Sequence, residues 1–104
     1  MSIIEINKDN FESEVLKSKQ PVLADFNADW CGPCRMLKPM LEEIAEERND
    51  YKIVSINIDK EEELADQFNV SSIPCVIVFK DGKETNRSIG LKPKEEIEEL
   101  MGGK

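Results

Sequence analysis

The chain has 104 residues, a formal net charge of −8 and a hydrophobic share of 39%. A chain of this length is expected to fold as one domain over residues 1–104, and we expect it to be a monomer. Its negative charge is repelled by the phosphates of nucleic acids and by anionic lipids, so neither is an expected partner. The segment from Met1 to Ile6 contains neither the basic nor the apolar part of a signal peptide, and three cysteines are too few for a disulfide scaffold. We therefore expect a cytoplasmic protein without a membrane-spanning segment.

Apolar strands alternate with helical patterns in the first half of the chain. Residues 3–6 are expected to form a short strand, and Asn7 can cap the helix that follows it. Residues 21–26 are mostly apolar on both faces, as in a central parallel strand. Between residues 33 and 48, apolar side chains recur at helical spacing, at Leu37, Leu41, Ile44 and Ala45.

A second strand and helix complete this half. Residues 51–58 form a mostly apolar strand, and a short helix is expected over residues 59–68. Asp59 and Glu62 have the spacing of a capping box at the start of that helix. Strand, helix, strand and helix in succession predict the parallel half of an α/β sheet.

The second half of the chain is expected to be antiparallel. Two strands, over residues 75–79 and 83–89, flank a hairpin turn at residues 81–82. Pro93 opens a last helix, and Gly102 ends it.

Two cysteines two residues apart, in the stretch Trp30-Cys31-Gly32-Pro33-Cys34, carry the clearest chemical signal. If a helix begins between them, Cys31 lies at its N-terminus and Cys34 lies one turn further, close enough for a disulfide. Pro33 suits the first helical turn. The free backbone N–H groups and the helix dipole would stabilise a thiolate on Cys31, which is the nucleophile of thiol–disulfide exchange.

A zinc site is the alternative for such a pair. Zinc takes four ligands, but the chain has no histidine and no second pair of closely spaced cysteines. Adding Cys75 gives three thiols, so a carboxylate or a second chain would have to supply the fourth ligand. We therefore favour redox chemistry and expect no metal.

Asp25 lies within an apolar strand, six residues before Cys31. Burial raises the pKa of a carboxyl group and makes it a competent base near neutral pH. The alternative is an aspartate that faces water near the end of the strand.

These features resemble the thioredoxin family over essentially the whole chain: Trp-Cys-Gly-Pro-Cys, the aspartate in the preceding strand, and Ile73-Pro74 about 40 residues later. The resemblance implies the α/β thioredoxin fold, a mixed sheet with a parallel βαβ half and an antiparallel ββα half, flanked by four helices. It also implies a protein-disulfide reductase in which Cys31 attacks the substrate disulfide and Cys34 resolves the mixed disulfide. A separate thioredoxin reductase would supply the electrons, and no cofactor is needed.

The resemblance assigns further roles. Asp25 would assist deprotonation of Cys34, the Ile73–Pro74 peptide bond would be cis, and the backbone of Ile73 would pair with an extended substrate. From sequence alone, a trans bond is expected. An apolar surface around Cys31 would contact protein substrates, with the expected members Trp30, Gly32, Pro33, Ile73, Pro74, Gly90 and Leu91.

Three residues depart from the family pattern. Asn27 stands at a position that is usually aromatic, and Ser55 stands where many members have a lysine near the aspartate. Without that cation, we expect the pKa of Asp25 to be raised further than in lysine-bearing members. Cys75 follows Pro74, where Thr or another small residue is usual, and we favour a packing role for it over a regulatory thiol.

Two other functions remain open from the sequence. An oxidant or isomerase relative would usually have histidine or another residue between the cysteines, and an export signal, neither of which is seen here. A binding subunit in which the dithiol is incidental would keep its role after Cys31→Ser and Cys34→Ser substitution.

Overall fold

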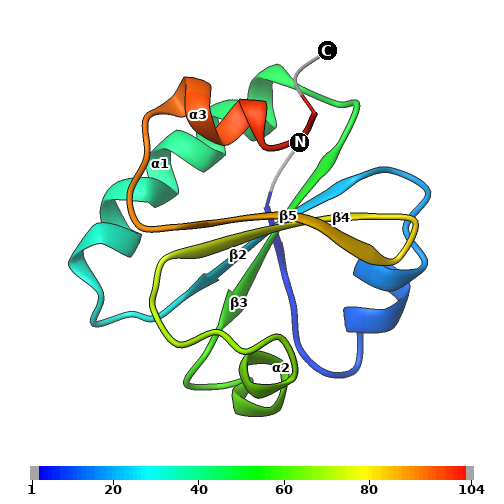
Figure 1. The fold of residues 1–104 in the computed structure, drawn as a ribbon, viewed down its shortest axis with the longest axis vertical. Coiled ribbons are helices and arrows are strands. Elements are labelled where there is room, and N and C mark those ends of the chain that lie inside the picture. The colour runs from blue at the N-terminus through cyan, green and yellow to red at the C-terminus, as the bar shows by residue number, and fades with distance from the viewer. Residues whose placement is uncertain (1–2, 103–104) are drawn as a thin grey trace.

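Five strands form one mixed sheet in the computed structural model, which describes residues 3–102 (Figure 1). The strands lie in the order β1-β3-β2-β4-β5 and have the bounds β1 (Ile4–Glu5), β2 (Val22–Asn27), β3 (Lys52–Asn57), β4 (Cys75–Lys80) and β5 (Lys83–Ile89). Strand β2 pairs in parallel with β3 and antiparallel with β4, so the two halves of the sheet meet at β2. The expected mixed sheet is confirmed. Met1 and Ser2, which entered the signal-peptide argument, lie outside the described residues.

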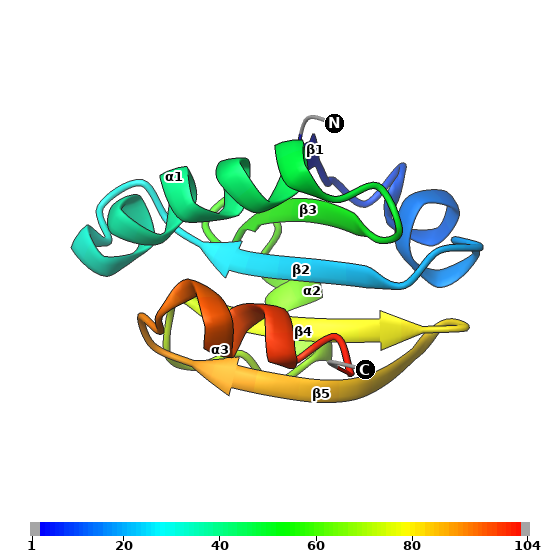
Figure 2. The same cartoon turned by 90° about the horizontal axis from the view of Figure 1, so that it is seen from above.

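In the described part of the chain, four helical segments flank the sheet, as expected. Their bounds are η1 (Glu12–Leu16), α1 (Gly32–Glu47), α2 (Glu62–Gln67) and α3 (Lys94–Glu99). Helices α1 and α3 cover one face, and α2 and η1 cover the other (Figure 1). Seen from above, α1 lies over the β3 and β2 side of the sheet, and α3 lies over the β4 and β5 side (Figure 2). Within residues 3–102, no helix is long and apolar enough to cross a membrane.

The helix expected after Asn7 forms as a π-helix. Asn7 does not cap it: the N-cap residue is Phe11, which makes no side-chain capping hydrogen bond. The side-chain oxygen of Asn7 instead accepts the backbone N–H groups of Asp9 and Asn10, in the turn before the helix, at 2.8 and 3.1 Å. The N–H of Lys17 donates to the carbonyl of Glu12, five residues earlier, at 2.8 Å. The apolar spacing in this segment indicates a helix but does not distinguish the wider π turn from an α turn.

The capping box expected at the start of α2 is wrong. The N-cap residue is Glu61, whose side chain makes no capping hydrogen bond. Oδ1 of Asn57 instead accepts the N–H groups of Asp59 and Lys60 at 2.9 and 3.2 Å. Asp59 lies two residues before the N-cap, and its carboxylate accepts a hydrogen bond from Nε1 of Trp30 at 2.9 Å.

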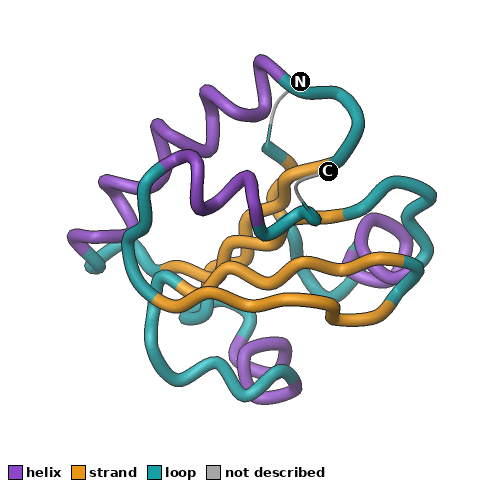
Figure 3. Tube along the Cα trace, turned by 45° about the horizontal axis from the view of Figure 1, so that its top comes forward, coloured by secondary structure: helices purple, strands orange, loops and turns teal. Residues whose placement is uncertain are grey.

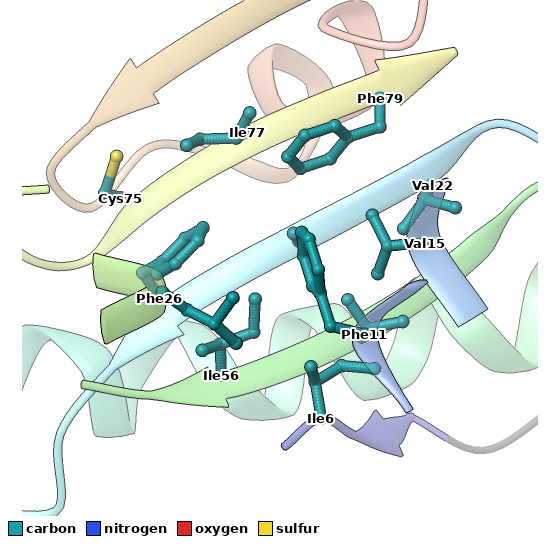
Figure 4. Close-up of a cluster of buried hydrophobic side chains, with 12 residues drawn as sticks. Ile6, Phe11, Val15, Val22, Phe26, Ile56, Cys75, Ile77 and Phe79 are labelled. Carbon is teal, nitrogen blue, oxygen red and sulfur yellow. The ribbon is translucent and has the colours of Figure 1, made fainter. Parts of the chain in front are cut away.

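Strand β2 sends alternate side chains to the two faces of the sheet. Phe26 belongs to the core cluster that includes Phe11, on the face covered by η1 and α2 (Figure 4). Leu23 packs in the second cluster with Leu37 of α1. Asp25, two residues after Leu23, therefore lies on the face that α1 covers.

Candidate functional site: a disulfide at the N-terminus of α1

Three loops meet at one end of the sheet (Figure 3). The register places them there, because Phe26 of β2 pairs with Cys75 of β4, which pairs with Ile89 of β5. The loop after β2 leads to Cys31, the loop before β4 contains Pro74, and the loop after β5 begins beyond Ile89. Segments that are distant in the sequence thus surround the cysteines.

Cys31 and Cys34 form a disulfide, with their Cα atoms 5.2 Å apart. Cys31 is the N-cap residue of α1 and has an extended backbone, with Pro33 in the first turn as expected. Its Sγ accepts the backbone N–H of Cys34 at 3.2 Å. The first turn of α1, all of it within the described residues, contains no acidic residue. The helix dipole and this N–H group therefore both favour negative charge on the sulfur of Cys31.

The peptide bond between Ile73 and Pro74 is cis, as the resemblance implied. Sγ of Cys31 lies 3.9 Å from the carbonyl oxygen of Ile73, 42 residues away in the sequence. The carbonyl of Pro74 accepts the N–H of Gly90 at 2.8 Å. These two contacts connect all three loops around Cys31.

Most of the predicted surface residues are at least partly accessible. Trp30 is 66% exposed and is held by its hydrogen bond to Asp59. Pro33 and Leu91 are exposed as well. Gly32, Ile73 and Gly90 are half-buried, whereas Pro74 is buried and offers its carbonyl to Gly90 rather than a surface to solvent.

Two exposed apolar residues were missed in the sequence. Met36 in α1 is 65% exposed, and Ile89 at the end of β5 is 50% exposed. Met36 does not fall on the apolar stripe of α1 that begins at Leu37. An apolar residue outside the buried stripe of a helix is expected to be exposed, so the sequence contains a signal for Met36. Ile89 gave no comparable signal, because apolar residues are common at the ends of strands.

Asp25 is only 4% exposed, so the alternative of an aspartate that faces water is wrong. Burial raises the pKa of its carboxyl group to about 7. A hydrogen bond from Asn27 opposes this rise, the charge of Glu5 adds to it, and the charge of Lys38 opposes it. A carboxyl group with such a pKa exchanges a proton near neutral pH.

One cleft brings Asp25 and Cys34 together. Both residues line it, together with Asn27, Ser55 and Lys38. Oδ1 of Asp25 is buried and has no hydrogen-bond partner among the described residues. The second cysteine of the pair thus shares a cleft with a carboxyl group that titrates near pH 7.

Comparison with known proteins identifies the family. The family model for thioredoxin matches residues 2–102. The chain belongs to the thioredoxin family. It is 45% identical over 102 residues to a thioredoxin of Bacillus subtilis, covering 97% of this chain and 96% of that protein. It is 47% identical over 96 residues to a thioredoxin of Chlamydia muridarum, covering 92% of each, and 46% identical over 85 residues to thioredoxin 1 of Synechococcus elongatus, covering 81% and 79%.

The protein is therefore a thiol–disulfide oxidoreductase, and the Cys31–Cys34 pair is its redox-active site. Thioredoxins use the cysteine pair itself and no prosthetic cofactor. Members of the family act on disulfide substrates and are reduced by thioredoxin reductase.

The third cysteine lies apart from this pair. Cys75 is 1% exposed and belongs to the core cluster with Phe26 and Ile77, on the face opposite α1 (Figure 4). Burial raises the pKa of its thiol. Both properties favour the packing role over a reactive thiol. Across residues 3–102, no group of three or more His, Cys, Asp or Glu side chains is arranged to hold a metal ion.

Proposed function

We propose that the protein is a general protein-disulfide reductase of the cytoplasm, in which Cys31 is the nucleophile, Cys34 the resolving cysteine and Asp25 the base. The observation that supports this division of roles is an asymmetry between the two sulfurs. Cys31 is the N-cap residue and lies 3.9 Å from the carbonyl of Ile73 in a neighbouring loop. Cys34 lies one turn further along α1 and lines the cleft that contains Asp25.

In the first step, the thiolate of Cys31 attacks one sulfur of the substrate disulfide. A sulfur–sulfur bond forms between Cys31 and the substrate, and the other substrate sulfur leaves as a thiolate and takes a proton from solvent. The N–H of Cys34 and the N-terminus of α1 stabilise the attacking thiolate. An extended substrate segment would bond to the backbone of Ile73, beside the sulfur of Cys31.

In the second step, Cys34 gives its proton to Asp25 and its thiolate attacks Sγ of Cys31. The second substrate sulfur leaves as a thiolate, which is protonated in turn. Two electrons pass from the protein to the substrate, and the Cys31–Cys34 disulfide remains. Thioredoxin reductase then returns two electrons to this disulfide. A dithiol reductant of this kind fits a compartment in which thiols are kept reduced.

The surface around Cys31 would bind protein substrates. Trp30, Pro33 and Leu91 are exposed, and Gly32, Ile73 and Gly90 are partly exposed. Aromatic and aliphatic side chains around a reactive sulfur suit substrates with an apolar segment beside the disulfide. Pro74 would contribute through the geometry of its loop.

A trapping experiment tests the roles of the two cysteines. In a Cys75→Ser background, Cys34→Ser protein should accumulate a mixed disulfide with insulin, because the resolving thiol is missing. Cys31→Ser protein is the matched control and should accumulate little. Equal trapping by both variants, or trapping only by Cys31→Ser, would show that Cys31 is not the nucleophile.

The reduction potential of the Cys31–Cys34 pair tests the direction of electron flow. It is measured in Cys75→Ser protein against defined dithiol buffers, with Trp30 fluorescence and thiol alkylation as readouts. A general reductant should have a potential below the cytosolic glutathione poise of about −220 to −260 mV. A potential near −120 mV, the range of strong disulfide oxidants, would contradict the proposal.

A further inference from the structure

A polar side chain occupies the space behind the active-site helix. Asn27 is the last residue of β2, is half-buried, and lines the cleft with Asp25 and Cys34. Its Nδ2 lies 2.9 Å from the carbonyl oxygen of Asp25, 3.4 Å from Oδ2 of Asp25 and 2.8 Å from Oγ of Ser55.

The orientation of this amide follows from its partners. The carbonyl of Asp25 and an ionised Asp25 carboxylate can only accept hydrogen bonds, so the nitrogen of Asn27 must face them. One N–H can serve Oγ of Ser55, and the other is shared between the two oxygen atoms of Asp25. Ser55 lies directly opposite Asp25 in the parallel ladder between β2 and β3, so it fixes the amide from the neighbouring strand.

We propose that Asn27, anchored by Ser55, is a positioning residue that holds Oδ2 of Asp25 and leaves Oδ1 as the oxygen that takes the proton of Cys34. This inference rests on the proposed function, in which Asp25 is the base. A proton on Oδ2 would face an N–H group, whereas Oδ1 has no hydrogen-bond partner among the described residues. The proton therefore resides on Oδ1.

The surroundings of Asp25 raise its pKa, and the hydrogen bond from Asn27 opposes that rise. Burial is the largest influence and raises the pKa of Asp25, and the charge of Glu5 in β1 acts in the same direction. The charge of Lys38 in α1 and the hydrogen bond from Asn27 lower it. The cleft is lined by further charged or titratable groups, which from α1 are Arg35, Glu42, Glu46 and, in the reduced protein, the thiol of Cys34, and from the loops Asp29 and Lys60. Opposite Asp25 in β4 stands Val76, which is apolar.

The test measures the pKa of Asp25 directly, from the pH dependence of its carboxyl carbon chemical shift in oxidised protein, where Cys31 and Cys34 do not titrate. Asn27→Ala removes a donor to the ionised form, so we expect the pKa to rise by roughly 0.5 to 1, a three- to tenfold weaker acid. Ser55→Ala keeps the hydrogen bond from Asn27 to Asp25 but removes the hydroxyl group that anchors the amide, so we expect a smaller rise in the pKa of Asp25. Ser55→Ala also serves as the second variant if Asn27→Ala does not fold.

A kinetic readout separates positioning from a merely structural role. The pH midpoint of the Cys34-dependent second step should rise with Asn27→Ala in the wild-type background and stay unchanged in the Asp25→Asn background. An unchanged or lowered pKa of Asp25 in both Asn27→Ala and Ser55→Ala would overturn the inference. If Asn27→Ala raises the pKa of Asp25 but the Cys34→Ser protein traps no mixed disulfide, the proposed function is overturned, whereas the placement of Asp25 by Asn27 remains supported.

Discussion

Replacing Asp25 with asparagine should shift the free energy of unfolding, relative to wild type, in favour of the variant as the pH rises. The carboxyl group of Asp25 is buried, and its pKa is raised from an ordinary value of 3.8 to about 7. The folded state therefore holds the proton to a higher pH than the unfolded state does. The stability associated with the neutral carboxyl group is fully present below pH 3.8, is lost as the pH rises through 7, and stays lost above it.

The size of the effect follows from the two pKa values. Their difference is 3.2, and each tenfold step in the equilibrium is worth about 1.4 kcal/mol, so an ionised Asp25 costs the folded state roughly 4 kcal/mol. Asparagine has nearly the same shape and does not titrate. Its amide brings a burial cost of its own, but that cost is the same at every pH and cancels when two pH values are compared.

The measurement is urea unfolding of oxidised wild-type and Asp25→Asn protein, followed by far-ultraviolet circular dichroism near pH 4 and near pH 8.5. The free energy of unfolding of the variant, relative to wild type, should be higher by about 3–4 kcal/mol at the alkaline pH than at the acid pH. Asp66→Asn, a substitution of an exposed carboxylate on α2, is the matched control and should show no such difference. A stability gain for Asp25→Asn that is constant with pH, or larger in acid, would refute the argument from burial.

Three further predictions concern other parts of the site. Gly90 has φ +97°, so Gly90→Ala should lower the free energy of unfolding by about 1–2 kcal/mol; Gly32→Ala, where a new Cβ meets nothing within 4 Å, should be nearly neutral in the same urea experiment. Ser55→Lys places an ammonium group opposite Asp25. The pH midpoint of disulfide reduction should therefore fall by about 1 pH unit, and an unchanged midpoint would contradict this prediction. Cys75 is buried and its thiol has a raised pKa, so iodoacetamide should label it far more slowly in native than in unfolded protein. Peptide mapping after mild oxidation should find only the Cys31–Cys34 disulfide. A disulfide to Cys75 would instead support the hypothesis of a regulatory thiol.

The sheet and the start of α1 could be predicted because local patterns determine them. The apolar run over residues 21–26 has the composition of a strand buried on both faces, and it became β2. Cys31 and Pro33 predicted the helix start to within one residue, because capping and proline geometry act over a single turn. The π-helix at η1 was not predictable, since its hydrogen-bond pattern leaves the apolar spacing almost unchanged.

Other features depend on contacts that no local pattern contains. Asp59 has capping-box spacing, yet it binds Trp30, 29 residues away, because the fold brings the indole within reach. The cis bond before Pro74 was expected only from the family resemblance. Burial of Asp25 followed from its strand, but the cleft that it shares with Cys34 depends on how α1 crosses the sheet.

Asn27 and Ser55 appeared in the sequence as two separate departures from the family, and the structure makes them one feature. They are 28 residues apart, and a hydrogen bond of 2.8 Å joins their side chains beside Asp25. A lysine would act on the carboxylate through its charge, which dissolved salt screens, whereas the amide acts through a hydrogen bond at short range, which salt screens little. The pKa of Asp25 in the wild-type chain should therefore change less between low and high salt than it does in Ser55→Lys protein. An equal salt dependence in the two proteins would mean that the surrounding charges, such as Lys38 and Glu5, oppose or add to the effect of burial on the pKa of Asp25 more strongly than the amide of Asn27 does.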